Sequence, residues 1–158
     1  MSGNFYELLS IMVNRIEVKE ASLEEVVLVN STITEFGEPY SKEYFAWRYD
    51  QKEHLLIVAY IESQPAWYVV GYDAYNDGSF YCWMAGVCPE WRGKGVLKAL
   101  MLYQDTRAKE KGYNKIKIKT RNNKRAMLSY LVKYWFNFTE VIPQEDIGLN
   151  RILLEKDL

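Results

Sequence analysis

The sequence predicts a single α+β domain built on a mostly antiparallel sheet with one β-α-β crossover. Its length of 158 residues, 49% of them hydrophobic, suits one domain with a single core. The apolar period changes from 3.6 to 2 near the middle of the chain, which indicates helices followed by strands. A later helical segment lies between two strands, and such a crossover makes the two strands parallel.

The N-terminal part of the chain is expected to be mainly helical. Apolar residues recur at helical spacing within residues 1–14 and predict a short helix there, followed by a strand at residues 16–19. Ser22 stands three residues before Glu25, an arrangement typical of a capping box at the start of a helix. A second helix is expected to begin at Ser41.

The middle of the chain predicts an antiparallel meander. Residues 55–61 and 68–75 are rich in Val, Ile and Tyr, and the intervening residues 62–66 indicate a hairpin. A second turn is expected at residues 76–78, before a third strand at residues 80–87.

The C-terminal part of the chain returns to a helical period and then alternates again. A helix is expected from about Val96 to a C-terminal cap at Gly112. Asn122 or Asn123 is expected to cap a further helix that runs to about Phe136. The strands expected here are residues 115–119, 138–142 and 152–155.

Composition excludes several classes of protein. No apolar run approaches the roughly 20 residues of a membrane span, and the N-terminus lacks the form of a signal peptide, so we expect a soluble, cytoplasmic protein. Cys82 and Cys88 lie six residues apart in a strand-like segment, which favours two buried thiols over a disulfide. His54 is the only histidine, so the sequence predicts no metal site and no histidine-based triad.

Charge is divided unevenly along the chain, although the net charge is only −1. Residues 1–79 carry 13 acids and five bases, a net charge of −8, whereas residues 80–158 carry 15 bases and eight acids, a net charge of +7. In a single domain this division predicts two faces of opposite sign, which can attract different ligands.

The segment 87–100, VCPEWRGKGVLKAL, joins a strand to a helix through two glycines. Glycines permit turn conformations and a close approach of a ligand to the backbone, and the free amides at a helix N-terminus bind anions such as a pyrophosphate. The P-loop motif of nucleotide triphosphatases does not fit, because Lys94 is followed by Gly95. From these residues alone, a solvated turn that caps a helix remains an equal alternative.

The pattern V-x-P-x-x-R-G-x-G-V, which begins at Val87, resembles the acetyl-CoA-binding motif of the GNAT superfamily of N-acetyltransferases. The spacing of Asn123, Ala126 and Tyr130 is similar to the next element of that family. The resemblance extends from about residue 16 to the C-terminus. It implies one GNAT-like domain over residues 1–158, with helices on both faces of the sheet.

The resemblance also implies roles for individual residues. The strand that ends at Val87 would pair with the pantetheine arm of acetyl-CoA, Asn123 would contact the cofactor near its thiol, and Tyr130 would donate a proton to the departing thiolate. Tyr134 is a second candidate for the proton donor, and simple packing is an alternative role for Tyr130. The residues expected to hold the pyrophosphate are Arg92, Gly93, Lys94, Gly95, Val96 and Leu97.

Four features depart from the family pattern. The spacing is off by one, because the residue counted from Asn123 is Tyr130 but the residue counted back from Trp135 is Leu131. Leu97 stands where the family has Gly or Ala, and Trp135 stands where it has Gly before Phe136. The strand at residues 80–87 carries no carboxylate that could serve as general base, so we expect Glu62, Asp73 or water to take the proton of the amine.

The expected function is N-acetyl transfer from acetyl-CoA to a small-molecule amine or basic peptide, attracted by carboxylates such as Glu35, Glu38 and Glu43. Ordinary solvated helix faces explain the same acids. One alternative is a CoA-binding sensor or interaction module without turnover. Another is a nucleic-acid binder, suggested by nine bases between Arg107 and Arg125 but opposed by a pI of 5.9. We expect no nucleic-acid or membrane partner, and the sequence leaves the oligomeric state open, a homodimer included.

Overall fold

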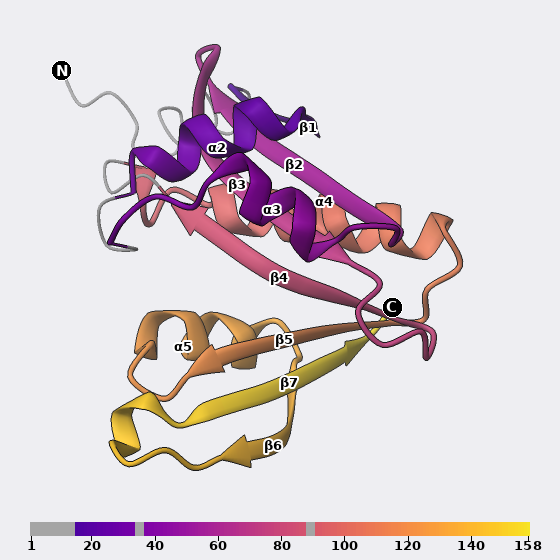
Figure 1. The fold of residues 1–158 in the computed structure, drawn as a ribbon, viewed down its shortest axis with the longest axis vertical. Coiled ribbons are helices and arrows are strands. Elements are labelled where there is room, and N and C mark those ends of the chain that lie inside the picture. Colours follow the sequence, from indigo (N-terminus) through magenta and orange to yellow (C-terminus); the bar gives the residue numbers. More distant parts are fainter. Residues whose placement is uncertain (1–14, 34–36, 88–90) are drawn as a thin grey trace, which may run out of the picture.

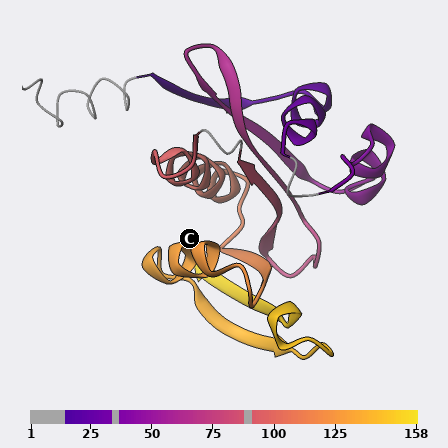
Figure 2. The same cartoon turned by 90° about the vertical axis from the view of Figure 1, so that its left-hand side faces the viewer.

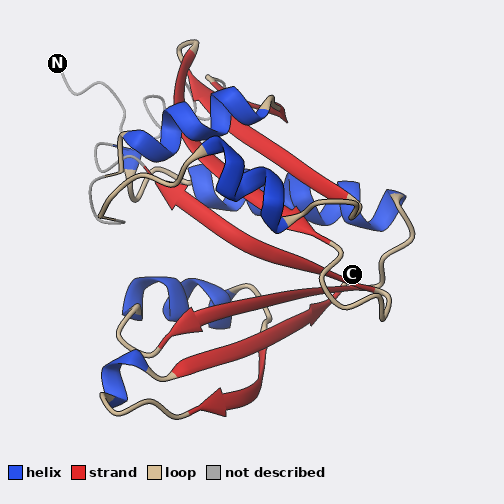
Figure 3. Cartoon of the chain, in the orientation of Figure 1, coloured by secondary structure: helices blue, strands red, loops and turns tan. Residues whose placement is uncertain are grey.

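A computed structural model of the chain describes residues 15–33, 37–87 and 91–158, so the helix expected within residues 1–14 lies outside the described residues. The described chain forms a seven-stranded sheet with the strand order β1-β2-β3-β4-β5-β7-β6 (Figures 1 and 3). The strands are β1 (Ile16–Glu20), β2 (His54–Ile61), β3 (Gln64–Tyr72), β4 (Ser79–Val87), β5 (Lys115–Arg121), β6 (Asn137–Ile142) and β7 (Arg151–Asp157). The helices are α2 (Leu23–Ser31), α3 (Lys42–Arg48), α4 (Val96–Glu110) and α5 (Arg125–Lys133), with a short 3-10 helix η3 (Ile147–Leu149).

Helices cover both faces of the sheet, as expected (Figure 2). On one face, Val26 of α2 and Phe45 of α3 pack against Tyr68 of β3 in one buried cluster. On the other face, Leu100 of α4 and Leu131 of α5 belong to a second buried cluster. None of the described helices is both long enough and apolar enough to cross a bilayer.

The first two described helices begin where the sequence predicts. The hydroxyl of Ser22 accepts from the Glu25 amide at 3.2 Å, and the Glu25 carboxylate accepts from the Ser22 amide at 2.7 Å, which confirms the capping box of α2. Ser41 caps α3 in the same way by accepting from the Tyr44 amide. Asn30, which interrupts the apolar face of α2, is buried and donates to the Tyr68 hydroxyl at 2.9 Å. Its burial is therefore compatible with the core.

The hairpin between β2 and β3 is tighter than predicted. Only Glu62 and Ser63 form the turn, with φ of 50° and 67°, and both signs match a two-residue type I′ hairpin. Pro65 therefore lies inside β3, opposite Tyr60 of β2. The missing amide of Pro65 is tolerated because β4 pairs with β3 only from Trp67 onward, so among the described residues Pro65 has a strand neighbour on one side only.

The helices of the C-terminal part differ from the prediction at the start of α5. Gly112 follows α4 with φ of 90°, which confirms the expected C-terminal cap. The expected cap at Asn122 or Asn123 is wrong, because the N-cap position of α5 is Lys124. Asn122 donates its side-chain amide to the Ile147 carbonyl at 3.1 Å, and the backbone amide of Asn123 donates to the Gly148 carbonyl at 2.8 Å. Both asparagines thus tie the start of α5 to η3.

The predicted parallel pair is β4 and β5, and it is short. Pairing extends only from Ser79 opposite Lys115 to Cys82 opposite Ile118, and the strands then diverge (Figure 1). The divergence coincides with a bulge in β4, since Cys82 faces Gly71 and Met84 faces Val70 of β3, which leaves Trp83 as an extra residue. Bulges bend a strand and increase its twist. The bulge therefore lies where β4 leaves β5.

Candidate functional site

The loop before α4 has the left-handed turns that its two glycines predict. Gly93 and Gly95 have φ of 72° and 78°, and Gly95 is the N-cap of α4 without a side-chain hydrogen bond. A Cβ atom built on either glycine would meet no atom within 4 Å, so the space beside the loop is open. The first amides of α4 therefore lack a side-chain cap, and uncapped amides of this kind can bind an anion at a helix N-terminus.

The side chains around this loop add positive charge. Lys94 is exposed, and its Nζ lies 4.7 Å from the ring centroid of Trp91. Arg92 is also exposed. Val96 is fully buried and Leu97 packs partly buried against the cluster on the α4 face, so both side chains lie against the core. The departure at Leu97 from the small residue of the family therefore adds to the core of that face.

A narrow pocket of about 60 Å³ lies where β4 and β5 separate. Its walls come from both strands, and Met101 of α4 and Met127 of α5 also line it. Because the ladder to β5 ends at Cys82, the edge of β4 from Trp83 onward has no strand partner on that side in the described chain. An extended ligand with amide groups can pair with such an edge.

Tyr130 lies on α5, the helix that contributes Met127 to this pocket, but is not among the residues that line it. Its ring is half-buried, and its centroid is 4.3 Å from that of Tyr134. Burial raises the pKa of Tyr130 above its ordinary value of 10.0, and the neighbouring Tyr134 adds to the rise. The phenol is therefore protonated at neutral pH and can donate a proton. Tyr134, at the C-terminal cap of α5, lies with its ring 5.9 Å from Lys98 Nζ.

Asn123 is exposed in the turn between β5 and α5 and does not line the pocket between the strands. Its backbone is held by the hydrogen bond to Gly148. The structure therefore brings together the glycine loop, the β4 edge and α5, but leaves Asn123 at the margin of this group.

The acids that the sequence suggested as general bases serve other contacts. Glu62 forms an ion pair with Arg15 at the β2-β3 turn. Asp73 accepts from the Asn76 amide at 2.8 Å and from the Tyr113 hydroxyl at 3.2 Å. Neither carboxylate lines the pocket between β4 and β5. The proton of an amine must leave by another route, and water is the remaining candidate from the sequence.

The acids expected to attract the acceptor are not gathered at a pocket. Glu38 and Glu43 are exposed. Neither lines the pocket between β4 and β5 or the pocket beside Arg48 at the end of α3. Glu35 lies outside the described residues.

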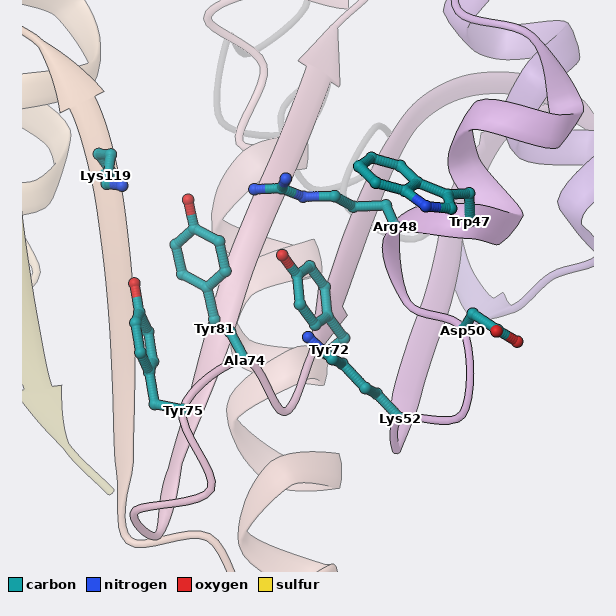
Figure 4. Close-up of a pocket in the computed structure, with 9 residues that line it drawn as sticks. All are labelled: Trp47, Arg48, Asp50, Lys52, Tyr72, Ala74, Tyr75, Tyr81 and Lys119. Carbon is teal, nitrogen blue, oxygen red and sulfur yellow. The ribbon is translucent and has the colours of Figure 1, made fainter.

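A larger pocket of about 470 Å³ opens on the face covered by α2 and α3 (Figure 4). Arg48 from the end of α3, Tyr72 from β3, Tyr81 from β4 and Lys119 from β5 all line it. Burial raises the pKa values of Tyr72 and Tyr81, so both hydroxyls are protonated at neutral pH. Lys119 lines the pocket between β4 and β5 as well. The two pockets therefore adjoin at β5.

Sequence reasoning missed this larger pocket and the bulge at Trp83. Lys119 stood out only as one of three alternating lysines, and nothing in the sequence connects Arg48 with β5. The pocket depends on contacts between segments far apart in the chain, which local patterns do not report.

Metal and thiol chemistry find no support in the described geometry. No group of three or more His, Cys, Asp or Glu side chains among the described residues could hold a metal ion. Cys82 is a free, buried thiol whose pKa is raised to about 12 by burial, so it stays protonated and a poor nucleophile.

Comparisons with known proteins identify the family and the fold. A family model described as "Acetyltransferase (GNAT) family" matches residues 20–133, which is more than half of the chain. No curated protein sequence gives a significant match.

Several solved structures share the fold at low sequence identity. The ribosomal-protein-S18-alanine N-acetyltransferase of Escherichia coli superposes with a TM-score of 0.75 at 13% identity, over 90% of this chain and 93% of its own. Ard1 from Thermoplasma volcanium gives 0.72 at 19% identity, over 91% and 98%. The yncA protein of Salmonella typhimurium, whose structure contains its cofactor acetyl-CoA, gives 0.74 at 13% identity, over 91% and 94%.

Proposed function

Because the chain belongs to the GNAT family of acetyltransferases, we propose that it transfers an acetyl group from acetyl-CoA to an amine by direct attack within a ternary complex. The observation that carries this proposal is the N-terminus of α4, which has no side-chain cap and is the next helix in the chain after β4, the strand that separates from β5. An anion site and an open strand edge in succession suit a ligand that carries a pyrophosphate next to an extended arm with amide groups.

The residues present fit acetyl-CoA at both ends of that arm. The amides from Gly93 to Leu97 would hold the pyrophosphate, with Arg92 and Lys94 supplying positive charge. The open edge of β4, from Trp83 to Val87, would pair with the pantetheine arm. Its backbone amides would also stabilise the oxyanion that forms at the thioester carbonyl.

The transfer step requires an unprotonated amine and a protonated leaving group. The amine nitrogen attacks the thioester carbonyl carbon, a C–N bond forms, and the C–S bond breaks. Water takes the proton that the amine loses, and Tyr130 donates a proton to the departing thiolate. The raised pKa of Tyr130 keeps its proton available at neutral pH. The protonated state of Cys82 favours direct transfer over a covalent intermediate on that residue.

Two measurements test this function. In thermal unfolding, acetyl-CoA is expected to raise the midpoint of the chain, because a ligand that binds only the native state stabilises it. In a thiol-release assay, acetyl-CoA with a panel of amines is expected to release free CoA only when an acceptor is present.

The outcomes separate the proposed function from the two alternatives that the sequence left open. A midpoint that rises with acetyl-CoA but no thiol release with any amine would favour a CoA-binding sensor. A midpoint that rises with a short DNA duplex and not with acetyl-CoA would favour a nucleic-acid binder. Either result would contradict acetyl transfer.

A further inference from the structure

Three lysines alternate along β5, and they differ in their ion pairs. Lys115 Nζ lies 2.7 Å from a carboxylate oxygen of Glu155, and Lys117 Nζ lies 2.6 Å from one of Asp77. Lys119 is half-buried at the larger pocket and forms no ion pair with any described residue. The positive charge of Lys119 is therefore available to interact with a ligand in the pocket.

Arg48 brings a second cation to the same pocket. Its guanidinium carbon lies 5.4 Å from the ring centroid of Trp83, and Figure 4 shows the side chain reaching from α3 past Tyr72 toward the Tyr81 hydroxyl. The Nε atom is buried, and within the described chain it has no hydrogen-bond partner. A buried N–H without a partner is costly, and an oxygen atom of a ligand would satisfy it.

The single acid that lines this pocket does not neutralise it. Figure 4 shows the Asp50 carboxylate directed away from the tyrosines and from Arg48. Lys52 adds a third cation, with its Nζ 5.2 Å from the ring centroid of Tyr72. Because Tyr72 and Tyr81 keep their protons, their hydroxyls can donate to an acceptor oxygen. The pocket therefore offers donors and positive charge.

We propose that the acceptor of the acetyl group is an amine that also carries an oxyanion, a carboxylate or a phosphate, and that Arg48 and Lys119 hold this oxyanion. The proposal rests on the acetyl-transfer function above and names the class of its acceptor. A pocket of about 470 Å³ with Trp47 and Tyr75 at its walls suits a small acceptor with a flat or apolar body.

The position of the pocket suits an acceptor. Trp83, which lies against Arg48, and Lys119 both line the smaller pocket where β4 and β5 separate. An acceptor anchored at Arg48 and Lys119 would therefore lie beside the strand edge proposed for the arm of acetyl-CoA. This acceptor differs from the cationic amine expected from the acids of the N-terminal half.

The test compares matched amines that differ only in the oxyanion. Thiol release from acetyl-CoA is measured with phenylalanine against phenethylamine, tryptophan against tryptamine, and phosphoethanolamine against ethanolamine. We expect kcat/KM to be at least about tenfold higher for the member that carries the oxyanion than for the member that lacks it, because hydrogen bonds to charged groups contribute that much. The first two pairs and the third pair distinguish carboxylate from phosphate.

Substitutions then assign the preference to the pocket. Arg48→Gln and Lys119→Gln are each expected to reduce kcat/KM about tenfold for the preferred amine with an oxyanion. They are expected to leave kcat/KM unchanged for the amines without an oxyanion. Lys109→Gln removes an exposed cation from α4, on the other face of the sheet, and is the matched control. The proposal would be overturned by equal kcat/KM values for amines with and without an oxyanion. An equal loss of kcat/KM in all three variants would overturn it as well.

A binding measurement keeps this proposal separate from the acetyl-transfer function. Trp47 lines the pocket and Trp83 lies against Arg48, so N-acetylphenylalanine is expected to change the tryptophan fluorescence of the chain without acetyl-CoA. The uncharged N-acetylphenethylamine is expected to have a much weaker effect. Turnover of amines without an oxyanion, together with no selective binding of N-acetylphenylalanine, would reject the proposed oxyanion site and leave the acetyl-transfer function standing. Selective binding with no thiol release from any amine would reject acetyl transfer alone.

Discussion

At the scale of single residues, backbone geometry and burial shape the proposed site together with its charged side chains. Gly93 and Gly95 adopt left-handed conformations that leave the first amides of α4 open. Burial raises the pKa values of Tyr130 and Cys82, so both side chains keep their protons at neutral pH. The first effect retains a proton donor, and the second removes a competing nucleophile.

Tyr130→Phe tests the proton donor. Loss of the phenol proton is expected to lower kcat about 100-fold, because a positioned acid contributes at least that much, while the KM for acetyl-CoA stays unchanged. Thiol-release kinetics measure both constants. The raised pKa also predicts that ionisation of Tyr130 does not lower the rate as the pH rises to about 10.

Tyr134→Phe is the matched control, since the ring of Tyr134 contacts that of Tyr130 at a tilted angle and Tyr134 lies one helical turn further along the chain. It is expected to retain most of the activity. If Tyr134→Phe loses the activity and Tyr130→Phe keeps it, Tyr134 is the proton donor and the assignment of Tyr130 is incorrect.

At the scale of elements, the C-terminus of α5 retains a strained residue. Trp135 occupies the position at which the family has glycine, and its φ is 69°, in the left-handed region that glycine favours. Its side chain is 84% exposed, so little packing compensates for the strain. The departure from the family pattern therefore changes the residue but retains the backbone conformation.

Trp135→Gly is expected to stabilise the chain by about 0.5–1 kcal/mol, because relief of a left-handed conformation exceeds the entropy cost of glycine. Urea unfolding followed by circular dichroism measures this change. Val132→Gly, at an exposed position within α5 itself, is expected to destabilise the chain by a similar amount. A loss of stability in Trp135→Gly would show that the indole contributes more than the strain costs.

At the scale of the whole molecule, the sequence predicts the elements better than their arrangement. The capping box at Ser22 and the Ile alternation of β5 act within a few residues, so the elements they indicate are present in the structure. The predicted bounds of an element are wrong where contacts between distant segments determine them. Pro65, for example, belongs to β3 because it pairs with β2, while β4 pairs with β3 only from Trp67 onward. The same limit explains why the bulge at Trp83 and the pocket that Arg48 and Lys119 both line were not predicted.

The structure shows where the charged residues of the acidic and basic halves of the chain lie. The basic C-terminal half contains the glycine loop, but two of the alternating lysines of β5 are paired with Asp77 and Glu155. The acidic N-terminal half contributes Arg48 to a pocket whose lining is basic. Local pairing therefore decides which charges can meet a ligand, and net charge along the sequence does not.

Calorimetric titration with acetyl-CoA measures whether the loop before α4 holds the pyrophosphate of acetyl-CoA. The native chain is expected to bind one acetyl-CoA, and Lys94→Glu is expected to weaken binding at least about tenfold, because it replaces an attractive charge by a repulsive one. Lys109→Glu makes the same charge change near the C-terminus of α4 and is expected to leave the affinity unchanged. Absence of binding to the native chain, or equal weakening by both substitutions, would contradict the claim.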